Sequence, residues 1–128
     1  LTIWLANLGL RRHASDFKDQ QELLLTIADL ITACYATDST VARVAQLAAE
    51  GKATRAHFAA AQLTVEDHAA AAWSAAARAL PSLVEPEKLA RRQAALQKFY
   101  VAPGHDSVAL ERILAATALE TPRWPFGV

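Results

Sequence analysis

The sequence predicts an all-α protein, an antiparallel up-and-down bundle of about four helices in which the first helix is the longest. Apolar residues recur at alternating steps of three and four over segments much longer than a strand. Turn signals containing Pro or Gly separate these segments by only a few residues, as is typical of antiparallel helical neighbours. No segment shows the alternation of apolar and polar residues that is typical of a half-buried strand.

The longest predicted helix runs from Asp16 to Glu50. Ser15 or Asp16 is placed to cap its start, and Gly51 follows its end, where glycine adopts the left-handed conformation at little cost. Asp38 falls on the predicted buried seam of this helix, where the spacing favours an apolar side chain. The apolar members of that seam are Leu24, Ile27, Ile31, Cys34, Val41, Ala45 and Ala48.

A second helix is predicted from a cap at Thr54 to Leu80, with Pro81 ending it. Alanine dominates this segment and raises its helix propensity. Small side chains also let helix axes approach to about 8 Å. Its predicted seam consists of Phe58, Ala61, Val65, His68, Ala72, Ala75 and Ala79, with Trp73 and Leu80 on the margin.

Two shorter helices follow. Pro86 suits the first position of a third helix that ends near Val101. Asp106 or Ser107 can cap a fourth helix that ends at Glu120. The predicted inward residues are Leu89, Leu96, Phe99 and Tyr100 on the third helix and Leu110, Ile113, Leu114 and Thr117 on the fourth.

We expect residues 1–128 to form one helical-bundle domain, because 128 residues suffice for a single core. The chain begins at Leu1 and contains no methionine, so we expect a C-terminal fragment of a longer protein. Residues 1–13 would be the tail of an upstream helix. Arg11 and Arg12 suit a helix C-terminus, and a phosphate or an acidic partner is the alternative explanation for them. Residues 121–128 would form a docked tail that places Trp124 and Phe126 on a surface.

The charge balance, the apolar runs and the cysteine count argue against several classes of protein and of site. Lys plus Arg and Asp plus Glu both number 13, whereas a nucleic-acid module normally carries a basic surface. No apolar run reaches the ~18 residues of a transmembrane segment. Cys34 is the single cysteine, so an intrachain disulfide is impossible. Its place on the seam predicts a buried, unreactive thiol.

The sequence predicts no catalytic, cofactor-binding or metal-ligating residues. A di-iron site in a helical bundle uses Glu-x-x-His motifs, and no glutamate of this chain is followed by histidine at that spacing. His57 and His68 share a helix face, but their Cα atoms would lie ~16 Å apart. The four glycines are isolated, so no glycine-rich phosphate loop exists.

Asp38 is the one candidate site residue. A lone buried carboxylate is costly, and three interpretations stay open. In the first, Asp38 forms a core ion pair with an arginine of a neighbouring helix, such as Arg78 or Arg92. In the second, it faces another domain or subunit at an interface. In the third, it has a catalytic role, although no partner group lies near it in the sequence.

Three runs of the long helix resemble the C-terminal extension of very-long-chain-type bacterial acyl-CoA dehydrogenases. They are Gln20-Gln21-Glu22-Leu23-Leu24, Ile27-Ala28-Asp29-Leu30-Ile31 and Tyr35-Ala36-Thr37-Asp38-Ser39-Thr40-Val41-Ala42-Arg43. Asp38-Ser39 stands where the family has Glu-Ser. The terminal run Arg123-Trp124-Pro125-Phe126 is similar to the C-terminal end of the family's sequences.

The resemblance implies an accessory helical domain, not catalytic alone, that packs on the catalytic core or dimer partner of an FAD-dependent enzyme. Such flavoproteins are oxidoreductases of fatty acid β-oxidation that convert fatty acyl-CoA to 2-enoyl-CoA. FAD belongs to the parent enzyme, and none is expected in this fragment. A homodimer and a cytoplasmic location are also expected. The alternatives are a self-contained protein-interaction module and a small-ligand sensor with Trp73 and Tyr35 as pocket walls.

Overall fold

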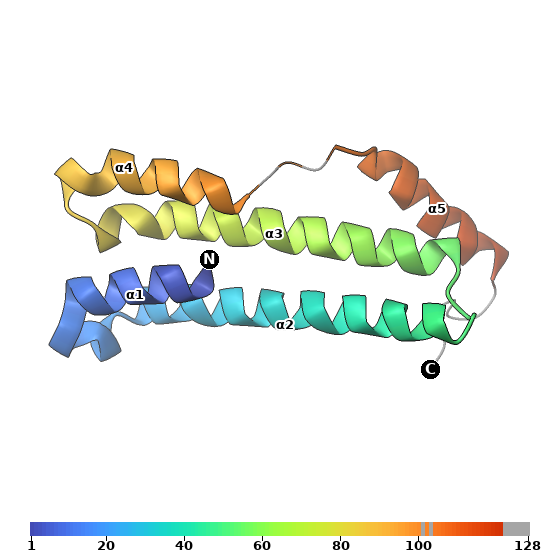
Figure 1. The fold of residues 1–128 in the computed structure, drawn as a ribbon, viewed down its shortest axis with the longest axis horizontal. Coiled ribbons are helices and arrows are strands. Elements are labelled where there is room, and N and C mark those ends of the chain that lie inside the picture. Colours follow the sequence, from blue (N-terminus) through green and yellow to red (C-terminus); the bar gives the residue numbers. More distant parts are fainter. Residues whose placement is uncertain (101, 103, 122–128) are drawn as a thin grey trace. The chain divides into compact units, whose positions relative to one another are not determined.

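The computed structural model describes residues 1–100, 102 and 104–121, which form helices and turns without any strand. This part of the chain contains five α-helices: α1 (Thr2–His13), α2 (Gln21–Ala49), α3 (Arg55–Leu83), α4 (Pro86–Leu96) and α5 (Ser107–Glu120) (Figure 1). It also contains two short 3₁₀ helices, η1 (Ala14–Asp19) and η2 (Gln97–Phe99). The all-α prediction is confirmed. The greatest length, 29 residues, is shared by α2 and α3.

The chain divides into two compact units, and each is described by itself. Unit 1 consists of Leu1–Tyr35 and His68–Ala102, and unit 2 of Ala36–Asp67 and Pro103–Val128. The single-domain organisation of residues 1–128 stays a prediction. The predicted docking of the tail concerns residues that, apart from Thr121, lie outside the described part of the chain.

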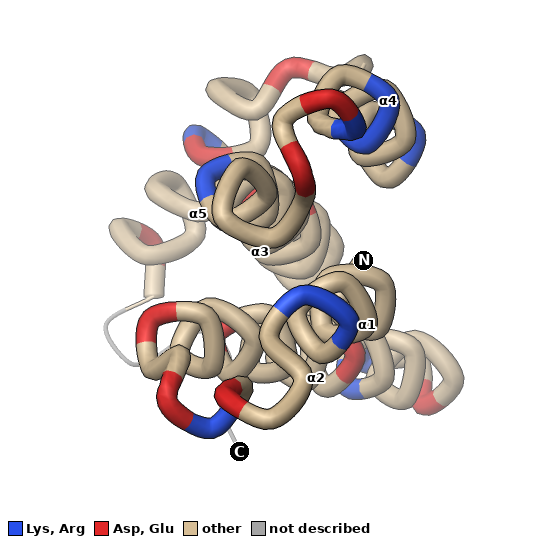
Figure 2. Tube along the Cα trace, turned by 90° about the vertical axis from the view of Figure 1, so that its left-hand side faces the viewer, with Lys and Arg blue, Asp and Glu red and all other residues tan. Residues whose placement is uncertain are grey.

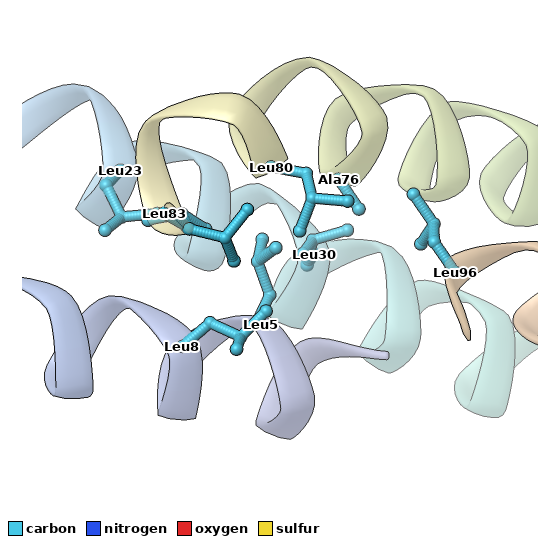
Figure 3. Packing of buried hydrophobic residues seen from close by; sticks show 9 residues of the cluster. Leu5, Leu8, Leu23, Leu30, Ala76, Leu80, Leu83 and Leu96 are labelled. Atoms are coloured by element: carbon cyan, nitrogen blue, oxygen red, sulfur yellow. The ribbon is translucent and has the colours of Figure 1, made fainter. Parts of the chain in front are cut away.

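Unit 1 has a core of large aliphatic side chains. Leu5 and Leu80 are completely buried, and Leu30 is 2% exposed. These three leucines come from α1, α3 and α2 and point toward one another (Figure 3). Burial of one such side chain is worth about 1.5–3 kcal/mol. The other buried members of this cluster are Leu8, Leu23, Ala76, Leu83, Val84 and Leu96.

Gly9 allows α1 to approach the start of α2 closely. A Cβ atom at Gly9 would lie 2.7 Å from Leu23 Cδ2 and 2.7 Å from Phe17 Cε2. Phe17 belongs to η1, which occupies the beginning of the segment predicted as the long helix. Phe17 packs against the core from this tighter turn. The long helix α2 therefore follows η1 and begins at Gln21, which corrects the predicted start at Asp16.

The structure corrects the prediction that Pro81 ends the second helix. α3 continues through Pro81 to Leu83. Proline inside a helix removes one hydrogen bond and costs about 3 kcal/mol. Leu80 and Leu83 flank it at 0% and 3% exposure. Burying these two leucines offsets the cost and keeps the last turn helical.

Unit 2 has a core of small side chains. Among its described residues, the buried apolar ones are Val44, Ala56, Ala59 and Ala61. The predicted inward residues of α5, from Leu110 to Thr117, are half-buried. The Glu66 carboxylate on α3 contacts His105 Nε2, in the segment that precedes α5.

The predicted helix ends of unit 2 are confirmed. Gly51 adopts a φ of 68°, and the Lys52 N–H donates to the Leu47 carbonyl at 2.8 Å, as in a Schellman motif. At the start of α3, the Thr54 N–H donates to His57 Nδ1 at 3.1 Å and the His57 N–H donates to Thr54 Oγ1 at 3.5 Å. This reciprocal pair resembles a capping box. Asp106 caps α5 by accepting from the Ala109 N–H at 3.1 Å.

Candidate functional site

The buried face of α2 lies one residue away from the predicted seam. Leu23, Leu30 and Val44 are 7%, 2% and 9% exposed, and they are spaced at multiples of seven. The sequence pattern instead predicts that the residue after each of these three lies on the buried seam. Ile31 is 56% exposed, and Ala45 is also exposed. Residues seven apart share a helix face, so the buried face passes through residue 37 and not through residue 38.

Asp38 is therefore exposed, which corrects the expectation of a buried carboxylate. The half-buried seam position is taken by Thr37. Among the described residues, no ion pair involves Asp38. Arg78, one of its predicted partners, donates from Nη1 to Ser74 Oγ at 3.1 Å. The interface role of Asp38 stays a prediction.

An apolar stripe, here called the α2 face, lies exposed on the unit 1 half of α2. It consists of Leu24, Ala28, Ile31 and Tyr35, at successive steps of four, three and four residues. Such steps return to the same side of a helix. Leu24 is half-buried, whereas Ile31 and Tyr35 are 56% and 75% exposed. The α2 face is a candidate contact surface because apolar residues gathered on one exposed face are typical of protein interaction sites.

The other residues that the sequence singles out have surroundings that favour no chemistry. Cys34 is exposed rather than buried, and its Sγ lies 3.8 Å from Thr2 Oγ1. His57 helps to cap α3. The Trp73 ring packs 5.8 Å from the Tyr100 ring, whereas Tyr35 points to solvent, so Trp73 and Tyr35 do not enclose a pocket. Within the described ranges, no group of three or more His, Cys, Asp or Glu residues lies together as a metal site would require.

Unit 2 contains a cavity of about 330 Å³ between α2 and α3. Val44 and Leu47 supply apolar walls, and Arg43 and His57 supply polar ones. Arg43 Nη1 already donates to Gln46 Oε1 at 3.1 Å, so its charge is held along α2. The sequence patterns did not predict this cavity, because its shape depends on how the side chains of two helices pack against each other.

The described helices include none with the length and apolar content of a transmembrane span.

The comparisons with known proteins yield one family. The model of the family described as acyl-CoA dehydrogenase, C-terminal domain, matches residues 1–98 of the chain. The matched range takes in α1 to α4 and ends before α5. No curated protein and no solved structure matches the chain significantly.

Proposed function

The chain belongs to the family of acyl-CoA dehydrogenase C-terminal domains, and from this we propose that it packs as an accessory helical domain on the catalytic core of an FAD-dependent acyl-CoA dehydrogenase. The observation that carries the proposal is the family match over α1 to α4. The exposed α2 face supports it, since a domain that docks on an enzyme core needs an apolar surface to bury.

The reaction of the parent enzyme is part of the proposal. By resemblance, the core oxidises fatty acyl-CoA to 2-enoyl-CoA, with FAD as hydride acceptor and a glutamate as the base that removes the α-proton. The flavin and the base belong to the core, and this chain contributes no reacting group. A homodimer and a cytoplasmic location complete the proposal on the same resemblance, and the single cysteine is compatible with a reducing compartment.

The α2 face provides the test. We expect Ile31→Asp to weaken binding of the whole chain to its dehydrogenase core at least about tenfold, or about 1.4 kcal/mol. The reason is that the variant would bury a charge in place of an apolar side chain. Titration calorimetry with the purified core, supplied as a separate chain, measures the effect.

Leu25→Asp is the matched control. Leu25 is 64% exposed on the same helix half but lies outside the α2 face, so we expect its variant to bind within about twofold of the parent chain. Equal losses in the two variants would contradict docking through the α2 face. Absence of any binding between chain and core would contradict the accessory function and would favour a self-contained interaction module.

A further inference from the structure

A basic groove runs between α1 and α4 in unit 1. Two cavities of about 480 Å³ and about 280 Å³ adjoin there, and they share Leu8, Arg11 and Arg92 as lining residues. Because the same side chains line both, the two cavities form one groove. Each has a volume near the range of small-molecule sites, roughly 300–1,000 Å³.

The groove has an excess of positive charge. Arg11, Arg12, Lys88 and Arg92 line it, and Glu85 is the one acidic residue among its lining. α1 contains no acidic residue, and its last turn is basic (Figure 2). Four cations against one carboxylate leave the lining with a net charge of +3.

Most of this charge is available to a ligand. Arg12 Nη1 forms an ion pair with Glu85, and their side chains remain 42% and 39% exposed. Among the described residues, no ion pair neutralises Arg11, Lys88 or Arg92. Arginine forks bind phosphate and carboxylate oxygens through two parallel hydrogen bonds. The net charge of +3 favours a multiply charged phosphate group over a single carboxylate.

The same groove has an aromatic and apolar wall. The Trp4 and Phe99 rings lie 5.5 Å apart at 44°, and both line the larger cavity. Leu83 and Val84 line the smaller one. An aromatic side chain provides a surface on which any nucleobase can stack. A ligand that fills the groove would therefore combine phosphates with a base or an apolar arm.

We propose that this groove binds the phosphate-bearing nucleotide end of a coenzyme A thioester. The choice of coenzyme A among phosphate esters rests on the proposed function, whereas the preference for a phosphate with an aromatic part rests on the groove itself. The site binds and positions the ligand and carries out no bond-making step. It also gives Arg11 and Arg12 a role beyond favourable charge at a helix end.

Titration calorimetry of the whole chain with coenzyme A tests the inference. We expect saturable binding that weakens at least about tenfold in Arg11→Ala/Arg92→Ala, because two charge-assisted contacts are lost. Arg91→Ala is the matched control. Arg91 is an exposed neighbour of Arg92 on α4 and does not line the groove, so its variant should bind within about twofold of the parent chain. Circular dichroism spectra that match the parent would show that the variants are folded.

Two further ligands separate the alternatives. Inorganic pyrophosphate should bind at least about tenfold more weakly than coenzyme A, since it lacks a part that stacks on Trp4. Vesicles of phosphatidylglycerol should not bind the chain. The proposal would be overturned if pyrophosphate bound as tightly as coenzyme A, or if the chain bound only to vesicles. It would also be overturned if the groove variant and the Arg91→Ala control lost the same affinity, or if coenzyme A did not bind.

The outcome is separable from that of the proposed function. A chain that binds coenzyme A through the groove but does not bind a dehydrogenase core would sustain the inference and contradict the accessory domain. A chain that binds the core through the α2 face but not coenzyme A would do the opposite.

Discussion

Unit 1 and unit 2 build their helix contacts from different side chains. Unit 1 buries leucines that are almost fully removed from solvent, including Leu5, Leu30 and Leu80. The buried residues described in unit 2 are one valine and three alanines. Buried apolar area stabilises in proportion to its size, so the contribution per buried residue is larger in unit 1. Unit 2 also contains helix caps, the Gly51 turn and a contact between the Glu66 carboxylate and His105 Nε2.

The largest expected effect of a mutation tests this difference directly. Leu80→Ala should lower the free energy of unfolding by about 3 kcal/mol, because a completely buried leucine leaves a cavity. Val44→Ala in unit 2 removes less volume and should cost about 1 kcal/mol. Urea unfolding followed by circular dichroism measures both values. Similar losses for the two variants would show that the units are equally dependent on packing.

A smaller effect is expected at glycine positions, which are closely packed at Gly9 in unit 1 and open at Gly104 in unit 2. Gly9→Ala should lower the free energy of unfolding by about 1–2 kcal/mol, because the new methyl group would collide with Leu23 and Phe17. Gly104→Ala is the control, since a Cβ there meets nothing within 4 Å. Thermal melts of the two variants give the comparison. A Gly9 variant as stable as the parent would mean that α1 moves away from α2 without cost.

The smallest expected effect concerns the exposed turn of unit 2. The hydrogen bond from Lys52 Nζ, at 2.8 Å, and that from Gln46 Nε2, at 3.0 Å, hold the pKa of the Glu50 carboxyl below its ordinary value of 4.5. Their stabilisation is therefore complete above pH 4.5 and is lost as the pH falls through the lowered pKa. Lys52→Ala should raise the pKa of Glu50, as measured by NMR titration. Lys98→Ala, a change in unit 1, should leave it unaltered.

Much of the helix plan could be predicted because its signals are local. The φ of Gly51, the cap at Thr54, Pro86 at the first position of α4 and Asp106 at the start of α5 all act within a few residues. Such signals need no knowledge of distant parts of the chain.

The face of α2 could not be assigned in the same way. Leu23 and Leu24, and likewise Leu30 and Ile31, are adjacent apolar pairs, so two neighbouring registers have similar apolar content. Asp38 distinguishes the two registers, since one places this carboxylate on the buried face and the other places Thr37 there. Apolar periodicity shows that a helix has a buried side, and polar interruptions help to show which side it is.

The all-α class, most helix boundaries and the family resemblance follow from the sequence alone, because propensity, caps and turn residues are properties of short segments. Three features required the packed structure: the buried face of α2, the continuation of α3 through Pro81, and the groove lined by Arg11 and Arg92. These features depend on which distant side chains meet. At Pro81, for example, the burial of Leu80 and Leu83 supplies free energy that outweighs the local preference for ending the helix.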